Sequence, residues 1–442
     1  MENRYDKYKD SGIAWIGEIP EHWVMGRIKN IIHTYKAGPF GSSLITSNLN
    51  NIGKYLIYTP EHIAANTTNL ESNLYLPDYR INEMGQFEIG KGDIVFPIVG
   101  TLGRAMQITS DMPNGIINQR LSKFRLFENI ICSNYFMWIF GKSDFYKIYI
   151  DMNSRGSFIL NLTKLIIGNM PIMLPSLPEQ QSIATYLDQK CGEIDELITL
   201  QEEMITKLQS YKQSVITEAV TKGLDKNVPL KDSGIEWIGE IPEHWICTVF
   251  KKFLSEPMQY GANEPAEECN YNDPRYIRIT DIKDDGTLRD DTFKSLPLEK
   301  AKEYMLTKGD LLFARSGATV GKTFLYKEDY AACFAGYLIK ARCNKNELLP
   351  NFVFYYTLSN VYQNWKNSIF IQSTIQNIGA DKYSVMPIII PPLSEQQSIA
   401  NYLDQKCSEI DELISIKQQK IEKLKDYKKS LIFECVTGKR KV

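Results

Sequence analysis

Histidine is scarce in this chain, and its few cysteines do not come in metal-binding pairs. The 442 residues include four histidines and eight cysteines, and no two cysteines are spaced as Cys-x-x-Cys. A structural zinc site needs about four such ligands at regular spacings, so the sequence offers no metal-ligand cluster. We expect the cysteines to be free, buried thiols.

Long apolar runs are also lacking. No run approaches the roughly 18 to 20 apolar residues that a membrane-spanning helix needs, and the first ten residues, MENRYDKYKD, are too charged for a signal peptide. We therefore expect a cytoplasmic protein. The formal net charge of −2 argues against a uniformly basic coat for nucleic acid, but it leaves room for a basic cleft among acidic surfaces.

The motifs of the common nucleotide-dependent and DNA-modifying enzymes are missing. The segment Ser316–Thr323 resembles a phosphate-binding loop, yet Ser316 stands where that loop requires its first glycine. A stand-alone NTPase using Lys322 is therefore a weak alternative. The chain contains neither the Asn-Pro-Pro-aromatic tetrad of an amino-methyltransferase nor an obvious nuclease cluster of acidic residues with a lysine. The residues favour recognition over catalysis.

The chain contains a long internal repeat. The stretch Leu177–Leu200 reads LPEQQSIATYLDQKCGEIDELITL, and it returns without gaps at Leu393–Ile416 as LSEQQSIANYLDQKCSEIDELISI. A second repeat precedes each half: KDSGIAWIGEIPEHW, from Lys9 to Trp23, recurs as KDSGIEWIGEIPEHW, from Lys231 to Trp245. We interpret the second repeat as a structural adaptor that leads into each half.

Each long repeat opens a segment with the periodicity of a coiled coil. Steps of four and three residues from Ile183, and again from Ile399, meet mostly apolar side chains between charged ones. A helix of about 40 residues with one apolar stripe needs a partner helix, and its own copy is the obvious one. The positions predicted to pack the helix pair and dock partners are Ile183, Leu187, Ile194, Leu197, Leu208, Ile399, Leu403, Ile410, Leu413 and Leu424.

The two segments between these repeats read as globular domains of one fold. Short β-branched and aromatic runs, such as Lys54–Tyr58 and Arg275–Ile279, alternate with Gly, Asn and Pro, which predicts strands joined by turns. One helix is expected at Cys132–Tyr149 and another around Phe352–Trp365. The frames KGDIVFPIVG, from Lys91 to Gly100, and KGDLLFARSG, from Lys308 to Gly317, mark the two segments as alike.

The predicted fold class is therefore α+β, with two similar globular domains separated by two long antiparallel helices in a pseudo-two-fold repeat. The predicted boundaries are an adaptor at 1–23, a first recognition domain at 24–176, a first spacer helix at 177–222, a linker with the second adaptor at 223–245, a second recognition domain at 246–392, and a second spacer helix with a basic tail at 393–442.

Several loops of the two domains combine glycines with side chains suited to DNA. Asn and Gln match adenine edges, Arg matches guanine, and Lys and Arg match phosphate. The candidates in the first domain are Lys36, Ser42, Ser43, Arg104, Asn118, Gln119, Arg120 and Lys123. Those in the second are Gln259, Asn263, Arg278, Thr280, Arg315, Lys322, Gln372 and Ser373.

With these features the chain resembles the specificity subunit of type I restriction-modification systems. The matching residues are the repeated L-[PS]-E-Q-Q-S-I-A-x-Y-L-D with I-D-E-L-I, the D-S-G-x-x-W-I-G-E-I-P-E-H-W adaptor, and GPFGSSL near the start of the first domain. The resemblance covers essentially the whole chain. It implies two target recognition domains, each reading one half of a bipartite double-stranded DNA site, held apart by the paired helices.

The resemblance also implies that the chain has no catalysis and no cofactor of its own. It would position two modification subunits, which carry S-adenosylmethionine and methylate adenine, and restriction subunits, which use ATP and Mg. The rival interpretation is a coiled-coil scaffold that binds other proteins without DNA specificity, in which case the candidate loops are ordinary turns. Comparing duplex binding of cognate and random sequence at stated salt would separate the two.

Overall fold

A computed structural model describes residues 4–40, 44, 49–100, 102–153, 162–266, 270–283, 286–371 and 377–442. The chain forms two compact units. Unit 1 consists of Met1–Gln201 with Gln419–Val442, and unit 2 consists of Glu202–Gln418. Each unit contains one globular domain, one adaptor hairpin and a portion of each of the two long helices.

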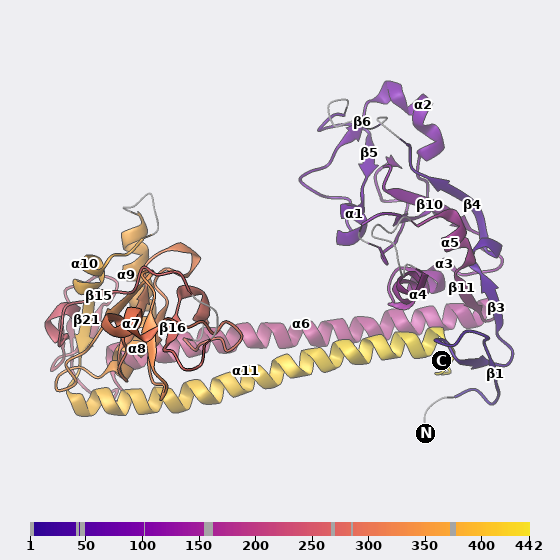
Figure 1. Ribbon diagram of the computed structural model, residues 1–442. Helices are drawn as coiled ribbons and strands as arrows, with labels where there is room; N and C mark the ends of the chain where they lie inside the picture. The colour runs from indigo at the N-terminus through magenta and orange to yellow at the C-terminus, as the bar shows by residue number, and fades with distance from the viewer. Residues whose placement is uncertain are drawn as a thin grey trace. The chain divides into compact units, whose positions relative to one another are not determined.

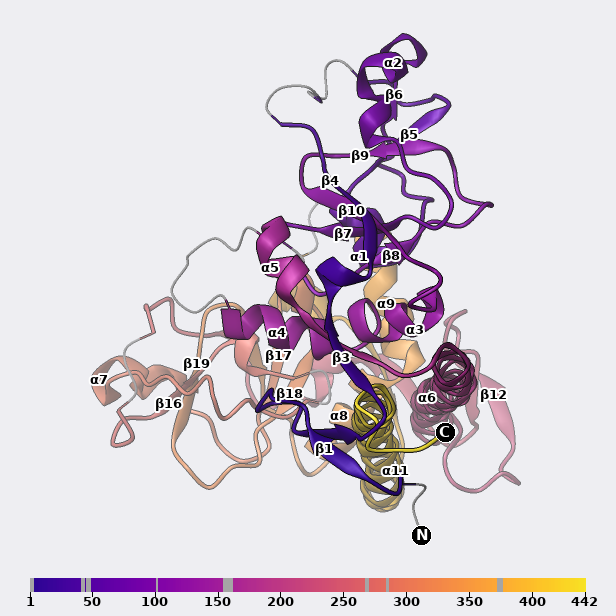
Figure 2. The same cartoon turned by 90° about the vertical axis from the view of Figure 1, so that its right-hand side faces the viewer.

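The domain of unit 1 is built on a four-stranded antiparallel sheet (Figure 2). Its strand order is β4 (Ile32–Ala37), β10 (Leu121–Leu126), β7 (Ile94–Pro97) and β8 (Met106–Gln107). A second sheet has the order β6 (Tyr75–Leu76), β5 (Tyr55–Tyr58) and β9 (Gly115–Ile117), with β5 and β9 parallel. A third, two-stranded sheet pairs β3 (Val24–Arg27) with β11 (Pro171–Leu174), so the chain enters and leaves the domain side by side.

The domain of unit 2 repeats this arrangement, except that no strand in its described part corresponds to β6. Its four-stranded sheet has the order β15 (Gln259–Tyr260), β20 (Leu338–Ala341), β17 (Leu311–Ala314) and β18 (Thr323–Leu325). A parallel pair follows, β16 (Arg275–Ile277) with β19 (Ala332–Phe334), and β14 (Ile246–Val249) pairs with β21 (Pro387–Ile390). The prediction of two similar α+β domains is confirmed.

Helices cover these sheets in both domains. In unit 1 they are α1 (Pro60–Ala65), α2 (Ile81–Met84), α3 (Ser133–Phe140), α4 (Phe145–Asn153) and α5 (Lys164–Asn169). In unit 2 they are α7 (Leu298–Ala301), α8 (Pro350–Leu358), α9 (Asn360–Ile371) and α10 (Ala380–Ser384) (Figure 1). Aromatic side chains of α3 and α4 pack into the main core of unit 1, as those of α8 and α9 do in unit 2.

The single helices predicted at Cys132–Tyr149 and around Phe352–Trp365 are each two helices. In unit 1 the break falls at Gly141–Asp144, where the Ser143 hydroxyl donates to the Ile139 carbonyl and accepts from the Phe145 N–H. In unit 2 it falls at Ser359, whose hydroxyl donates to the Tyr356 carbonyl. A serine side chain can replace a helical backbone hydrogen bond, and apolar periodicity does not reveal such a break.

The two long helices are α6 (Leu177–Lys222) and α11 (Leu393–Val436), and they pair within each unit (Figure 1). In unit 1 the first turns of α6 share a core with the last turns of α11, and in unit 2 the last turns of α6 share a core with the first turns of α11. This pairing is antiparallel, as predicted. Two equivalent ion pairs cross it: Lys428 Nζ to Asp195 in unit 1 and Lys212 Nζ to Asp411 in unit 2, each at 2.6 Å.

The predicted seam is right at most positions and wrong by one residue at two of them. Ile183, Leu187, Ile194, Ile399, Leu403 and Ile410 are buried, and Leu208 and Leu424 are half-buried. Leu197 and Leu413, however, are 44% and 46% exposed. After Leu187 the seam steps by four to the buried Cys191 rather than by three, so the position facing the partner helix is Ile198 and not Leu197. A heptad alternates steps of three and four residues, so the sequence alone does not show which step comes first after Leu187.

Each adaptor repeat folds as a short hairpin, β1 (Tyr8–Asp10) with β2 (Glu18–Pro20) in unit 1 and β12 (Leu230–Asp232) with β13 (Glu240–Pro242) in unit 2. The tryptophan that ends each repeat, Trp23 or Trp245, is completely buried. In unit 1 the hairpin also holds the basic tail, because the Lys439 ammonium donates to the Ile16 carbonyl at 2.7 Å. The hairpins therefore anchor helix ends to their domains.

Candidate nucleic-acid interface

In the domain of unit 1, several predicted site residues meet at the loop between β9 and β10. Asn118 Oδ1 accepts a hydrogen bond from the Arg120 N–H at 3.0 Å, which fixes the turn, and Gln119 and Arg120 are exposed. The Arg120 guanidinium lies 3.5 Å from Glu61 at the start of α1. A Cβ on Gly38 would lie 1.9 Å from the Asn118 carbonyl oxygen, so only glycine lets the two loops touch.

The glycine turn after β7 reaches the same loop. Gly100 and Gly103 both have positive φ, 84° and 86°, which favours glycine. A Cβ on Gly100 would come within 2.9 Å of the Arg120 guanidinium. Arg104 follows on the turn and is exposed. Ser42 and Ser43 lie outside the described residues.

Lys36 and Lys123 contact other side chains of the domain. The Lys36 ammonium donates to Gln86 Oε1 at 2.5 Å and lies 5.2 Å from the centre of the Phe87 ring. The Lys123 ammonium lies 2.8 Å from Asp93, whose carboxylate is almost fully buried and also pairs with Arg125 at 2.9 Å. The DNA-binding role of Lys123 stays a prediction, and its contacts are those of a structural ion pair.

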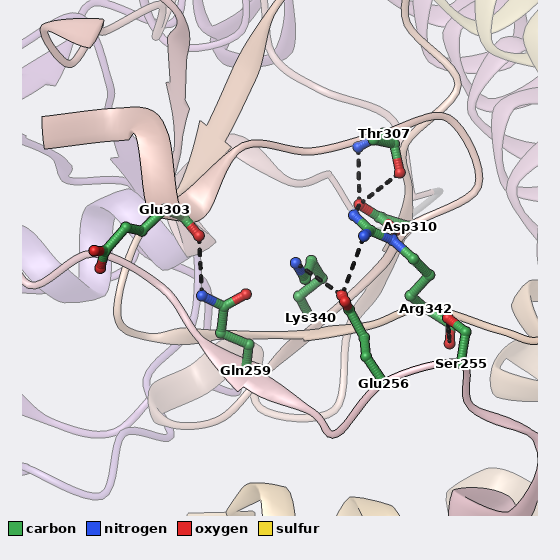
Figure 3. Close-up of polar contacts among 8 residues, drawn as sticks. All are labelled: Ser255, Glu256, Gln259, Glu303, Thr307, Asp310, Lys340 and Arg342. Carbon is green, nitrogen blue, oxygen red and sulfur yellow. Dashed lines mark hydrogen bonds and ion pairs between the residues drawn. The ribbon is translucent and has the colours of Figure 1, made fainter. Parts of the chain in front are cut away.

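The domain of unit 2 contains the counterpart of this buried charge network (Figure 3). Arg342 lies between two carboxylates, 2.7 Å from Asp310 and 3.3 Å from Glu256, and the buried Lys340 reaches Glu256 at 3.1 Å. The Asp310 carboxylate raises the pKa of Arg342, first through their hydrogen bond. Asp93 and Asp310 occupy the same place in the two repeated K-G-D frames. The shared frame therefore marks a buried carboxylate that pairs with basic side chains in both domains.

Gln259 and Arg278 also have partners inside the domain. The Gln259 amide donates to the Glu303 carbonyl at 3.0 Å. The Arg278 guanidinium makes two hydrogen bonds to the buried Asp281 carboxylate, at 2.9 and 3.2 Å. Thr280 beside it is exposed, and its hydroxyl lies 3.4 Å from Asp281. These contacts fix the chain after β16 and leave Thr280 facing outward.

Two further candidates of unit 2, Asn263 and Arg315, lie at the loop between β19 and β20. The Arg315 guanidinium lies 5.0 Å from the centre of the Tyr260 ring and 3.5 Å from the Gly336 carbonyl. Asn263 is exposed, and a Cβ on Gly336 would meet its Oδ1 at 3.1 Å. Tyr337, at the tip, is 61% exposed. It was not predicted from the sequence, although it stands where Arg120 stands when the two K-G-D frames are aligned.

Lys322 lies on the turn before β18, after Gly321 with φ of 85°. Thr323, which a phosphate-binding loop would use to hold magnesium, is buried in β18. That burial argues against the NTPase alternative. Gln372 and Ser373 lie outside the described residues.

Two searches over the described residues found nothing. In that part of the chain, no group of three or more His, Cys, Asp and Glu side chains is placed to hold a metal ion. Within the same ranges, no helix is long and apolar enough to cross a membrane.

The arrangement can therefore bind but shows no catalytic centre in what the structure describes. Each domain presents a loop tip with exposed polar or aromatic side chains, flanked by glycine turns that carry a basic residue. Such tips suit contacts with base edges, and the basic turns suit phosphate.

Comparisons with known proteins agree with this geometry. The family model of the type I restriction modification DNA specificity domain matches residues 20–209 and 259–426. A putative type I restriction enzyme MjaX specificity subunit from Methanocaldococcus jannaschii is 25% identical over 97% of this chain and 96% of its own length. The type I restriction enzyme EcoBI specificity subunit from Escherichia coli is 23% identical over 79% of this chain and 75% of its own length.

Two solved structures share the fold. One, from work on complex assembly and conformational transition of the type I R-M system, has a TM-score of 0.72 at 18% identity and covers 95% of this chain and 98% of its own. The HsdS subunit from Thermoanaerobacter tengcongensis has a TM-score of 0.53 at 17% identity, with the same coverages. Because the family model spans most of both halves, the chain belongs to the family of type I restriction-modification DNA specificity domains.

Proposed function

We propose that the chain reads a bipartite, asymmetric DNA site, with one domain on each half-site. Membership of the family implies recognition of DNA sequence and a subunit that is not itself an enzyme. The observation that supports two unlike half-sites is that one fold occurs twice with different residues at its tips. Arg120 in unit 1 and Tyr337 in unit 2 hold the same place in the corresponding loops and differ in chemistry.

The proposed base readers are the exposed side chains of these tips and their neighbours. In unit 1 they are Gln119 and Arg120, with Arg104 placed for the phosphates. In unit 2 they are Asn263, Arg315 and Tyr337. An arginine suits the two acceptors of guanine, and an exposed tyrosine suits stacking or contact with a thymine methyl group. Lys36, Lys123, Gln259 and Arg278 are proposed to support these loops from behind.

We propose that the paired helices set the distance between the half-sites. Half-sites about one turn of DNA apart lie about 34 Å from each other. The helices are paired by buried apolar side chains and by the Asp195–Lys428 and Lys212–Asp411 ion pairs, so each end is fixed to its domain. A spacer of this kind makes the number of base pairs between half-sites a constant of the protein.

The same helices are proposed to dock two modification subunits. Leu197, Leu200 and Tyr427 are exposed on the helices of unit 1, and their counterparts Leu413, Ile416 and Tyr211 are exposed in unit 2. Two like apolar surfaces suit two copies of one partner. S-adenosylmethionine, and ATP with Mg for any restriction subunit, are proposed to belong to these partners and not to this chain.

Sequencing the methylated bases in cells that express this chain with its modification subunit tests the proposal. The expected result is one motif with two unlike halves separated by a fixed gap. A contiguous or palindromic motif would contradict it, and absence of any methylation above the partner alone would favour the scaffold alternative.

A further inference from the structure

Unit 1 contains a cavity of about 550 Å³ between its domain and the helix pair. Its walls come from four segments: the glycine turn after β7, the break between α3 and α4, one turn of α6 and the last turns of α11. Apolar side chains such as Phe145, Ile198 and Phe433 form part of the lining. A volume between about 300 and 1,000 Å³ is typical of sites for small ligands.

The lining carries an excess of positive charge. Six cationic side chains face four carboxylates: Arg104, Lys142, Lys147, Lys425, Lys428 and Lys429 against Asp144, Asp195, Glu422 and Asp426.

Within the lining, Lys428 pairs with Asp195 and Lys425 with Glu422, while Lys142 pairs with Asp188 outside it. Among the residues that the structure describes, no ion pair or side-chain hydrogen bond is formed by Arg104, Lys147 or Lys429. These three cations are available to an anion.

Two of these cations are brought together by a glycine. Gly103 has φ of 86°, and a Cβ there would lie 3.3 Å from the Cβ of Lys147 on α4. The turn and the helix therefore pack closely, with Arg104 next in the chain. Both Arg104 and Lys147 line the cavity. An arginine and a lysine at one wall are the side chains that most often bind phosphate oxygens.

Unit 2 carries different side chains at the corresponding place. In the alignment of the two long repeats, Lys425 and Lys429 of α11 correspond to Gln209 and Gln213 of α6. Gln213 donates to the Leu358 carbonyl at 2.5 Å, and the Thr217 hydroxyl accepts from the Asn360 N–H at 2.9 Å. The uncharged side chains of Gln213 and Thr217 thus bond the domain of unit 2 to α6.

The helix breaks of the two domains also differ in length. Four residues, Gly141–Asp144, separate α3 from α4, whereas Ser359 alone separates α8 from α9. In unit 1, Gly141, Lys142 and Ser143 of the longer break line the cavity. Among the described residues, Lys429 makes no bond to the domain of unit 1 like that of Gln213 in unit 2.

We propose that this cavity binds a phosphate group, supplied either by the DNA backbone or by a free nucleotide. Arg104, Lys147 and Lys429 provide the charge, and the apolar walls suit the sugar or base beside the phosphate. The backbone source rests on the proposed DNA-reading function, and the nucleotide source does not. In either case the α11 lysines of this site are glutamines at the corresponding positions of α6, so the site distinguishes unit 1 from unit 2.

The test replaces the α11 lysines by the residues that α6 carries at the same positions. Lys425→Gln with Lys429→Gln is made in the full chain, and Lys420→Gln with Lys423→Gln, which removes equal charge from α11 outside the lining, is the matched control. Circular dichroism establishes that both variants fold. Calorimetry measures ATP binding, and fluorescence anisotropy measures binding of a mixed-sequence duplex at several salt concentrations.

Loss of tenfold or more in ATP affinity in the first variant alone identifies a free nucleotide as the ligand, since charge-assisted bonds have about that effect. A fall of about 0.9 per lost contact in the salt slope of duplex binding, again in the first variant alone, identifies the DNA backbone. Equal behaviour of the two variants in both assays overturns the inference. A wild-type chain that binds no duplex refutes the proposed function, and the ATP measurement still decides the cavity.

Discussion

The indole N–H of Trp23 donates a hydrogen bond to the carboxylate of Glu179 at 3.0 Å, and Trp245 donates to Glu395 at 2.9 Å. The tryptophan ends the adaptor repeat, and the glutamate begins the helix repeat. Each adaptor repeat is therefore hydrogen-bonded to a helix repeat, which explains why the two repeats occur together. A histidine next to each tryptophan, His22 or His244, reaches the same carboxylate.

The next residue of the repeat ties the helix to the domain. The Gln180 amide donates to the carbonyls of Ile130 and Pro175 and accepts from the Cys132 N–H, and Gln180 is completely buried. Gln396 makes the same three kinds of bond in unit 2. The E-Q-Q triplet is thus a joint between adaptor, domain and helix.

Removing the joint carboxylate is expected to destabilise its unit. Glu179→Ala leaves the buried Trp23 N–H without an acceptor, which costs about 2 to 3 kcal/mol of unfolding free energy. Denaturant unfolding followed by circular dichroism measures the loss. Glu203→Ala, on the exposed face of α6, is the control and is expected to change stability by less than about 0.5 kcal/mol. Equal stability of the two variants would show that the joint contributes nothing.

The buried charge network is expected to affect stability, and the loop between β9 and β10 is expected to affect DNA binding. Asp93→Asn removes the partner of Lys123 and Arg125 and should lower the unfolding free energy by about 3 to 5 kcal/mol. Arg120→Ala should leave stability nearly unchanged and weaken binding to cognate duplex. If Lys123 reads DNA instead, Lys123→Gln will reduce binding while the melting temperature stays the same.

The one-residue correction to the helix seam can be tested with neighbouring substitutions. Ile194→Asp places a charge at a position that is 6% exposed and should disrupt helix pairing, at a cost of at least about 3 kcal/mol. Leu197→Asp lies on the exposed face and should leave the unfolding transition in place. On the proposed function it should weaken binding of the modification subunit by about tenfold, measured by calorimetry.

The matched pair in unit 2 is Ile410→Asp and Leu413→Asp, with exposures of 4% and 46%. Ile410→Asp is expected to disrupt helix pairing. Leu413→Asp is expected to leave the unfolding transition in place and to weaken binding of the modification subunit. Loss of folding in Leu197→Asp and Leu413→Asp would return these two positions to the seam and contradict the correction.

Buried thiols are expected to make the fold sensitive to alkali. Burial raises the pKa of Cys435, at the end of α11, to about 12, above the ordinary value of 9.0. The unfolded chain therefore loses this proton first. The stability from the neutral thiol is present below pH 9 and is lost as pH rises toward 12.

Urea unfolding between pH 8 and pH 10 measures this effect. The slope contributed by one thiol approaches about 1.4 kcal/mol per pH unit, and Cys435→Ala should reduce the total slope. Cys132→Ala, whose thiol is only half-buried, is the control. An unchanged slope in Cys435→Ala would mean that its thiol ionises alike in both states.

Much of the architecture could be predicted from the sequence because the two halves of the chain contain the same repeats. The repeats located α6 and α11, and the shared K-G-D frame marked two domains of one fold. Single-sequence periodicity could not place the helix breaks at Ser143 and Ser359, since a hydroxyl that replaces a backbone bond leaves the apolar pattern intact. It also could not choose between steps of three and four at Cys191.

The candidate site was predictable in outline and not in its contacts. Residue type alone cannot distinguish Arg120, at an exposed tip, from Arg278, which is bound to a buried carboxylate from its own turn. The pairing depends on the burial of Asp281 in that turn. Tyr337 was not predicted because a tyrosine is as readily half-exposed as buried and no motif surrounds this one. Aligning the two domains on their common frame would have placed it at the tip.

The central claim, that each domain reads its own half-site, is tested most directly by methylated-base sequencing of three forms of the complex: wild type, Arg120→Ala and Tyr337→Ala. The wild type is expected to give one motif with two unlike halves and a fixed gap. Arg120→Ala should relax base preference in one half only, and Tyr337→Ala in the other half only, with the gap unchanged. Relaxation of the same half by both variants, or a wild-type motif without two halves, would contradict the account.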